Sequence, residues 1–321
     1  MRGVLSAWNR WWFAPAWATD LAVCRALFCF GVLALYGGLG LPLWAEVGPE
    51  FARPIKVLGL VSFAPLPGPW LEAAWGVWRL ALVTAGLGLA TRLSTAVAFG
   101  LGFYLLALPH HFGRLEHTDG VVVLLLGVLA ASRCGDAWSV DAWLGRRWDG
   151  EARRGQAEAS GAYRWPVRMA QLVLSAVFCC AGLSKVINGG WAWVTSDTLA
   201  TVLVKAQLRP AGFGPIVDWG AWLAQHKTLM VLSAAGTIVV ELGYPVALFS
   251  RRARWVWLPG MVGLLIGIRL LIGPWFGSFM LAHVFWVPWS RWWGRPDVPP
   301  AGVGPSASPA PAPEPTTGGG P

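Results

Sequence analysis

Long apolar runs recur along this chain, and they constrain its fold more than any other feature of the sequence. A helix that crosses a bilayer needs about 20 predominantly apolar residues, and helices satisfy their own backbone hydrogen bonds in lipid. Segments that reach or approach this length lie at 21–44, 71–90, 93–109, 119–132, 167–187, 229–249, 255–273 and 274–290. The sequence therefore predicts an all-α, polytopic integral membrane bundle of about eight transmembrane helices.

The composition agrees with a bilayer as the solvent of this chain. Of its 321 residues, 55% are hydrophobic and 13% are charged, whereas about a quarter of the residues in soluble domains are charged. The 23 tryptophans match the aromatic belts of membrane proteins. The net charge of +9 comes from basic residues that lie between apolar runs rather than in one patch. We therefore predict the lipid bilayer, and no nucleic acid, as a partner.

The positions of the arginines predict the orientation of the bundle. With eight spans, every second loop lies on the same side of the membrane as Arg2 and Arg10, and most of the arginines fall in these loops. Loops rich in positive charge stay in the cytoplasm. The N-terminus is therefore expected inside, with the Trp-rich first residues as an interfacial helix. We expect a membrane domain over 1–295 and a disordered cytoplasmic tail, rich in Pro, Ala and Gly, over 296–321.

Charged residues within the predicted spans are candidates for function, because a charge at mid-bilayer costs roughly 2.5–3.5 kcal/mol even on lenient scales. Arg79 lies near the middle of the second predicted span and Glu241 near the middle of the sixth. We expect them to form a structural ion pair between helices, with Arg269 as a second partner for Glu241. Arg25, near the inner end of the first span, is expected to extend its guanidinium to the cytoplasmic surface.

Lys185 lies at the outer end of the fifth predicted span, just before a Gly-Gly pair. Burial disfavours the charged form of a lysine, and a neutral amine can take a proton from a weak acid such as a hydroquinone. In this interpretation Lys185 is a general base, and Trp191 and Trp193 are candidate substrate contacts. In the alternative, Lys185 reaches outward to the membrane surface and the two tryptophans are interfacial anchors. The residues alone leave both interpretations open.

Three histidines gather in the predicted outer loop between the third and fourth spans, in the segment PHHFGRLEHTDG. His110 and His117 fall on one face if this segment is helical. The HxH and HxxxH spacings are absent from it, so we predict no metal site. A proton-relay or substrate-binding role for His110 and His117 stands beside the alternative of a hydrogen-bonded interfacial loop.

Several stretches make the chain recognisable by their order and spacing: the first span with Arg25, LEHTDGVVVLLLGVLAASRCGDAWSVDAWL, WPVRMAQLVLSAVFCCAGLSKVINGGWAWV, and ELGYPVALF. With them the chain resembles the HTTM (horizontally transferred transmembrane) family. The membrane domain of this family is shared by vitamin K-dependent γ-glutamyl carboxylase and many bacterial membrane proteins. The resemblance covers most of residues 15–290.

The resemblance implies a base in the membrane. A lysine that follows an Ala-Gly pair deprotonates a reduced quinone in such a domain, and the quinone then reacts with oxygen to give a strong base. Lys185 matches that lysine, and His117 matches a histidine at the start of the fourth span that assists it. Both lie on the predicted outer side. In the penultimate helices, where relatives carry a histidine, this chain has Arg269.

The sequence thus predicts a membrane protein of this family with quinol-linked base chemistry at an outward-facing site. A reduced quinone is the expected cofactor or substrate, and no residue pattern identifies a protein partner. Beyond residue 295 the low-complexity tail stands where the carboxylase has a large soluble substrate domain, so we do not expect protein carboxylation. The alternative function is a non-enzymatic membrane component, such as a maturation, immunity or export partner. Arginine in preference to lysine, with abundant Ala and Gly, indicates a bacterial inner-membrane protein.

Overall fold

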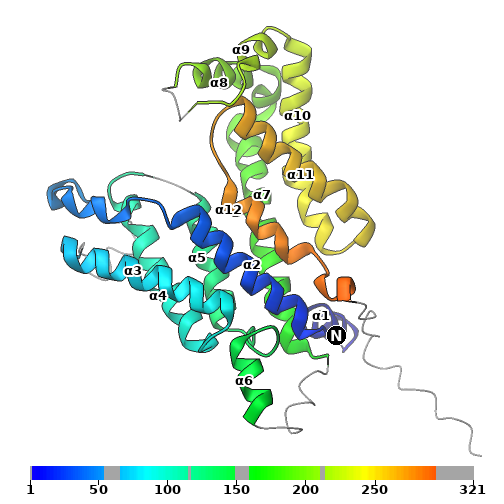
Figure 1. Ribbon diagram of the computed structural model, residues 1–321. Coiled ribbons are helices and arrows are strands. Elements are labelled where there is room, and N and C mark those ends of the chain that lie inside the picture. The colour runs from blue at the N-terminus through cyan, green and yellow to red at the C-terminus, as the bar shows by residue number, and fades with distance from the viewer. Residues whose placement is uncertain (1, 54–65, 115–116, 149–158, 210–213, 294–321) are drawn as a thin grey trace, which may run out of the picture.

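The computed structural model describes residues 2–53, 66–114, 117–148, 159–209 and 214–293. Within these ranges the chain is helical, apart from one isolated antiparallel bridge between Ala16 and Ser160 and the connecting turns. Each of the eight apolar segments contains a helix (Figure 1). The predicted tail at 296–321 lies outside the described residues.

The elements follow in chain order. They are α1 (Arg2–Phe13), α2 (Ala18–Tyr36), η1 (Leu41–Glu46), η2 (Pro49–Phe51), α3 (Gly68–Leu87), α4 (Thr91–His111), α5 (His117–Ala130), α6 (Val140–Trp148), α7 (Gly161–Thr195), α8 (Thr198–Gln207), α9 (Trp219–Ala224), α10 (Lys227–Gly243), η5 (Tyr244–Leu248), α11 (Arg251–Leu271), α12 (Gly277–Ala282), η6 (His283–Trp286) and η7 (Trp289–Trp293).

Five helices in the described part of the chain are long and apolar enough to cross a membrane: α2, α4, α7, α10 together with η5, and α11. Two shorter apolar helices, α5 and the segment formed by α12 and η6, accompany them. The predicted all-α, multi-pass membrane bundle is confirmed, and the number of eight spans stays a prediction. The first span is shorter than expected, since α2 ends at Tyr36, before two glycines.

The helices form two groups, which meet where α2 and α5 contact α7 and where α12 packs between them (Figure 1). In the first, α3 packs on both α2 and α4, and α4 packs on α5. In the second, α7 packs on α10, and α10 packs on α11. α12 contacts α2, α5 and α7, so it joins the groups.

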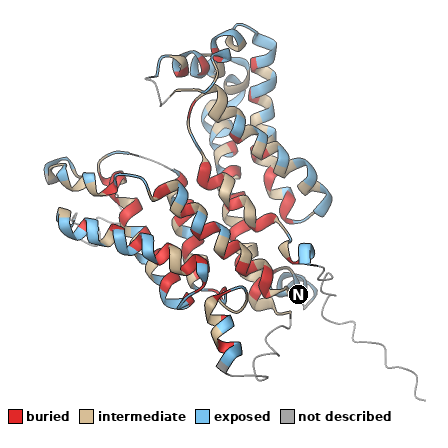
Figure 2. Cartoon of the chain, in the orientation of Figure 1, coloured by how far each residue is buried: buried red, intermediate tan, exposed pale blue. Residues whose placement is uncertain are grey.

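Burial is uneven between these groups (Figure 2). Most residues of the buried apolar core lie on α2, α3, α4 and α5, and α7 and α12 add others. α10 and α11 bury few side chains, and α10 encloses only Met230, Ala234 and Glu241. Their outer faces are largely apolar and exposed, as expected of helices that contact lipid.

The arginine-rich connections gather at one end of the bundle. α1 packs on α7, and Trp138, before α6, packs on Trp293 with ring centroids 4.5 Å apart. Asp20 at the start of α2 accepts a 2.6 Å hydrogen bond from the backbone N–H of Ser290. This shared end is the one that the positions of the arginines predict to be cytoplasmic.

Arg25 is fully buried, which corrects the expectation that it reaches the surface. Its guanidinium donates hydrogen bonds to the carbonyls of Cys134 (2.6 Å), Trp138 (2.7 Å) and Gly86 (3.4 Å). The turn between α5 and α6 and the end of α3 thus supply acceptors inside the bundle, so extension into water is not needed. Arg25 ties three connections to α2.

Asp141, in the first turn of α6, caps a different helix. Its carboxylate accepts hydrogen bonds from the backbone N–H groups of Ala90 (2.8 Å) and Thr91 (2.7 Å) and from the Thr91 hydroxyl (2.7 Å). These donors lie at the N-terminus of α4, where backbone N–H groups lack helical partners. Burial alone raises the pKa of Asp141, but the hydrogen bonds outweigh it and the pKa is lowered.

Candidate functional site

A close approach of α7 and α10 creates the site around Lys185. Gly182 lies one turn before Lys185, and a Cβ added there would be 2.9 Å from Cδ2 of Leu242 and 3.1 Å from Cβ of Glu241. Any larger residue would push the helices apart. The Gly-Gly pair that follows Lys185 interrupts α7, since Gly190 has a φ of 53° and a ψ of −144°. Lys185 therefore lies near the end of the regular part of α7.

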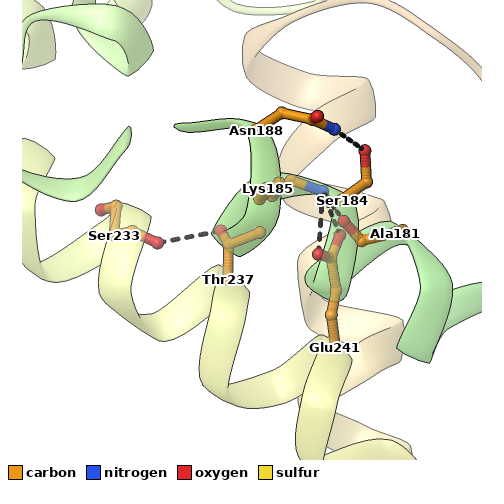
Figure 3. Close-up of polar contacts among 7 residues, drawn as sticks. All are labelled: Ala181, Ser184, Lys185, Asn188, Ser233, Thr237 and Glu241. Carbon is orange, nitrogen blue, oxygen red and sulfur yellow. Dashed lines mark hydrogen bonds and ion pairs between the residues drawn. The ribbon is translucent and has the colours of Figure 1, made fainter. Parts of the chain in front are cut away.

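Lys185 and Glu241 form an ion pair across this helix contact (Figure 3). Nζ of Lys185 lies 2.8 Å from both carboxylate oxygens and 3.4 Å from the carbonyl oxygen of Ala181. The Lys185 side chain is 25% exposed and that of Glu241 is 8% exposed. Nζ also lies 5.6 Å from the ring centroid of Trp193, a cation–π geometry. The carboxylate is enclosed, and the amine keeps one open side.

The two arginines expected to pair with Glu241 lie elsewhere. Arg79 is exposed, because α3 directs Trp75 and Trp78 into the core and leaves Arg79 on its outer face. Arg269 donates hydrogen bonds to the carbonyls of Gly214 and Gly273 near the end of α11. The expected ion pair of Arg79, Glu241 and Arg269 is therefore replaced by the pair of Glu241 and Lys185.

A second polar pair follows Glu241 by one helical turn, and sequence reasoning missed it. The hydroxyl of Tyr244 lies 3.1 Å from Nε2 of His283, and Nδ1 of His283 lies 2.8 Å from the carbonyl oxygen of Phe279. A carbonyl can only accept, so we assign the proton to Nδ1, and Tyr244 then donates to Nε2. The available signals were a lone histidine in the last apolar segment and the tyrosine of ELGYP.

The histidine-rich segment is not one continuous helix, because α4 ends at His111 and α5 begins at His117. Nε2 of His110 lies 3.2 Å from Oδ2 of Asp119, whose Oδ1 accepts a 3.0 Å hydrogen bond from the hydroxyl of Tyr36. His117 is exposed at the start of α5. The structure thus joins His110 to Asp119 and Tyr36, whereas the expected shared helical face of His110 and His117 is not formed.

The other predicted site residues occupy the outer part of α7. Trp193 contacts Lys185 as described, while Trp191 is 84% exposed. Among the described residues, no group of three or more His, Cys, Asp or Glu side chains could hold a metal ion. At Lys185, the 2.8 Å distances between Nζ and both carboxylate oxygens of Glu241 are short enough for a proton to pass between the amine and the carboxylate.

Comparison with protein families decides the membership of the chain. The model of the HTTM domain matches residues 13–272. The chain belongs to the HTTM domain family. The matched range of this HTTM protein contains Lys185, Glu241 and Tyr244 and ends before His283. Searches of curated proteins and of solved structures gave no match.

Proposed function

We propose that this HTTM protein is a membrane enzyme in which Lys185 accepts a proton from a lipid-soluble acidic substrate. The family resemblance makes a reduced quinone the substrate class. The observation that carries the proposal is the pair of Lys185 and Glu241, with 2.8 Å between Nζ and both carboxylate oxygens. Because the Lys185 side chain is 25% exposed and that of Glu241 only 8%, a substrate can reach the lysine.

Glu241 solves a difficulty of using a lysine as a base. An ammonium group holds its proton and cannot accept another, so Lys185 must first give that proton away. Transfer of one proton from Nζ to the adjacent carboxylate leaves a neutral amine and a neutral acid. It removes the charge of a buried carboxylate and the charge of a partly buried ammonium group, and taking such charges out of water is costly. The amine then takes the proton of an acidic hydroxyl, and the resulting ammonium balances the negative charge left on the substrate.

The surroundings of Lys185 fit a substrate that arrives through lipid. Leu183, Ile187 and Trp191 on the same part of α7 are 43%, 76% and 84% exposed. Apolar side chains of this kind bind the rings of a quinol, and Trp193 holds the amine through its ring face. His117 and His110 keep the proton-transfer and substrate-binding roles that the sequence predicts for them.

The test is the loss of menaquinol in nanodiscs that contain the purified protein and oxygen, followed by mass spectrometry. We expect turnover by the wild type and a loss of about 10²-fold or more in Lys185→Ala. Lys205→Ala is the matched control, because Lys205 is an exposed lysine of α8. Equal turnover in wild type and Lys185→Ala would refute the proposal, as would a wild type that leaves menaquinol unchanged.

The hydrogen bonding within the same ion pair favours a second candidate function, that of a non-enzymatic membrane component. Two hydrogen bonds of 2.8 Å satisfy Lys185 and Glu241 within the protein and link α7 to α10. A pair with this role alone can be replaced by apolar residues of similar size without loss of assembly. Two results together would support this candidate. The Lys185→Met/Glu241→Leu variant would retain the same partners as the wild type in pull-downs, and the wild type would not consume menaquinol.

A further inference from the structure

A cavity lined by four arginines lies at the inner end of the bundle, far from Lys185. Its volume is about 190 Å³, and its walls include Arg164 and Arg168 of α7 and Arg251 and Arg254 of α11. One carboxylate, Asp20, also lines it and accepts hydrogen bonds of 2.6 and 3.1 Å from Ser290. Four guanidinium groups against one carboxylate make the cavity strongly positive.

Backbone carbonyls and aromatic rings hold three of these guanidinium groups. Arg164 donates to the carbonyl of Trp11 at 3.2 Å, Arg168 to that of Leu248 at 3.1 Å, and Arg254 to that of Ala247 at 3.0 Å. Arg168 also lies over the ring of Trp11 and Arg254 over the ring of Trp286. Carbonyls and rings position a cation without neutralising it, so the mutual repulsion of Arg164, Arg168 and Arg254 persists.

A second cavity, of about 500 Å³, adjoins the first. The two share Arg251, Arg254, Trp286, Val287 and Pro288 in their walls. The rest of the second cavity runs along α11, where its walls are apolar, and it is closed on the other side by polar side chains. The apolar wall consists of Trp255, Leu258, Pro259 and Val262, and the polar side chains are His283 and Arg291. A positive chamber and an apolar channel thus meet at a common wall.

We propose that the two cavities together bind one anionic phospholipid. Its phosphate lies among the four arginines, because guanidinium groups form paired, charge-assisted hydrogen bonds with phosphate oxygens. An acyl chain follows the apolar channel along α11. The cavities lie at the predicted cytoplasmic end, where a leaflet rich in anionic lipid is found.

The arginine cluster of this site is remote from Lys185. Arg168 and Lys185 are 17 positions apart on α7, which is roughly 25 Å at 1.5 Å per residue. Loss of either property therefore leaves the other measurable.

Native mass spectrometry of the purified full chain tests the proposal with phosphatidylglycerol and phosphatidylcholine as competing lipids. We expect retention of phosphatidylglycerol, and at least about tenfold weaker retention in Arg251→Gln/Arg254→Gln. Arg146→Gln/Arg147→Gln is the matched control, since it removes two exposed arginines of α6 at the same end. Equal retention of both lipids, or an equal loss in the control variant, would overturn the proposal.

Two further experiments are needed. The first distinguishes loss of the lipid site from loss of folding, and the second distinguishes a lipid phosphate from a soluble one. Val262→Trp keeps every arginine and fills the apolar channel. It is therefore expected to weaken the binding of phosphatidylglycerol and to leave the binding of inorganic phosphate unchanged. Glycerol 3-phosphate and inorganic phosphate are expected to compete poorly, because they lack an acyl chain. Displacement of the lipid by either soluble phosphate at micromolar concentration would overturn the lipid assignment and give the cavity to a soluble anion.

Discussion

Replacing Lys185 should lower the free energy of unfolding more than replacing its partner Glu241. Lys185→Met leaves the Glu241 carboxylate, 8% exposed, without its cation, whereas Glu241→Gln leaves an amine that is 25% exposed and has a path to the surface. Removing one partner of a buried pair costs about 3–5 kcal/mol. We take the lower end, about 3 kcal/mol, for Lys185→Met, and about 1 kcal/mol for Glu241→Gln because its amine is partly solvated.

The double variant Lys185→Met/Glu241→Gln isolates the interaction between the two residues. It removes the stranded carboxylate, so it should be more stable than Lys185→Met alone, at a total cost of about 1–2 kcal/mol. Unfolding in mixed micelles, followed by circular dichroism, gives the free energies. Lys205→Met, at an exposed lysine of α8, is the control and should cost less than about 0.5 kcal/mol.

Two outcomes would refute this reasoning. Glu241→Gln could cost as much as Lys185→Met, which would mean that the lysine, too, is trapped when its partner is removed. The costs of the single variants could instead add in the double variant, which would mean that the two side chains do not interact in the folded protein.

Three more results are expected from other parts of the fold. Arg25→Gln should lower the unfolding free energy by about 2–4 kcal/mol, because it removes donors to three carbonyls; a loss below about 1 kcal/mol in chemical denaturation would contradict this. The pKa of Asp141 is lowered in the folded state, because its hydrogen bonds outweigh burial, so wild type should lose its stability advantage over Asp141→Asn as the pH falls below the ordinary value of 3.8; parallel pH profiles would exclude this. Gly88→Ala should lower the melting temperature, because φ is +72° and an added Cβ would be 2.8 Å from Cα of Ser139, whereas Gly100→Ala, with open space around it, should preserve or raise it.

Local signals in the sequence predicted the helices well. Apolar runs give a helix in lipid whatever surrounds it, so each expected segment contains one. The predicted fifth span ends at residue 187, just before the Gly-Gly pair, and α7 is interrupted at Gly190, because glycine adopts the positive φ found there. The order and spacing of four stretches, from the first span with Arg25 to ELGYPVALF, indicated the HTTM family, which the family model confirmed.

Partners of the buried charges could not be predicted in the same way. The sequence offers several cations in other predicted spans as partners for Glu241, and nothing in it selects one. The rotation of α3 about its axis places Arg79 on the outer face, away from Glu241. The carbonyls that satisfy Arg25 come from residues 61 to 113 positions away. Every residue has a backbone carbonyl, so the sequence does not show which carbonyls will accept hydrogen bonds from Arg25. Its burial therefore could not be predicted.

The sequence by itself determined that this chain is a helical membrane protein of the HTTM family with a lysine before a helix break. Only the tertiary structure decided that Lys185 meets Glu241, that Tyr244 meets His283, and that four arginines share one cavity. Helix formation depends on neighbours along the chain. These side-chain contacts depend instead on how closely two helices pack and on the rotation of each helix about its axis. At α7 and α10 that packing depends on Gly182, which has no side chain to hold the helices apart.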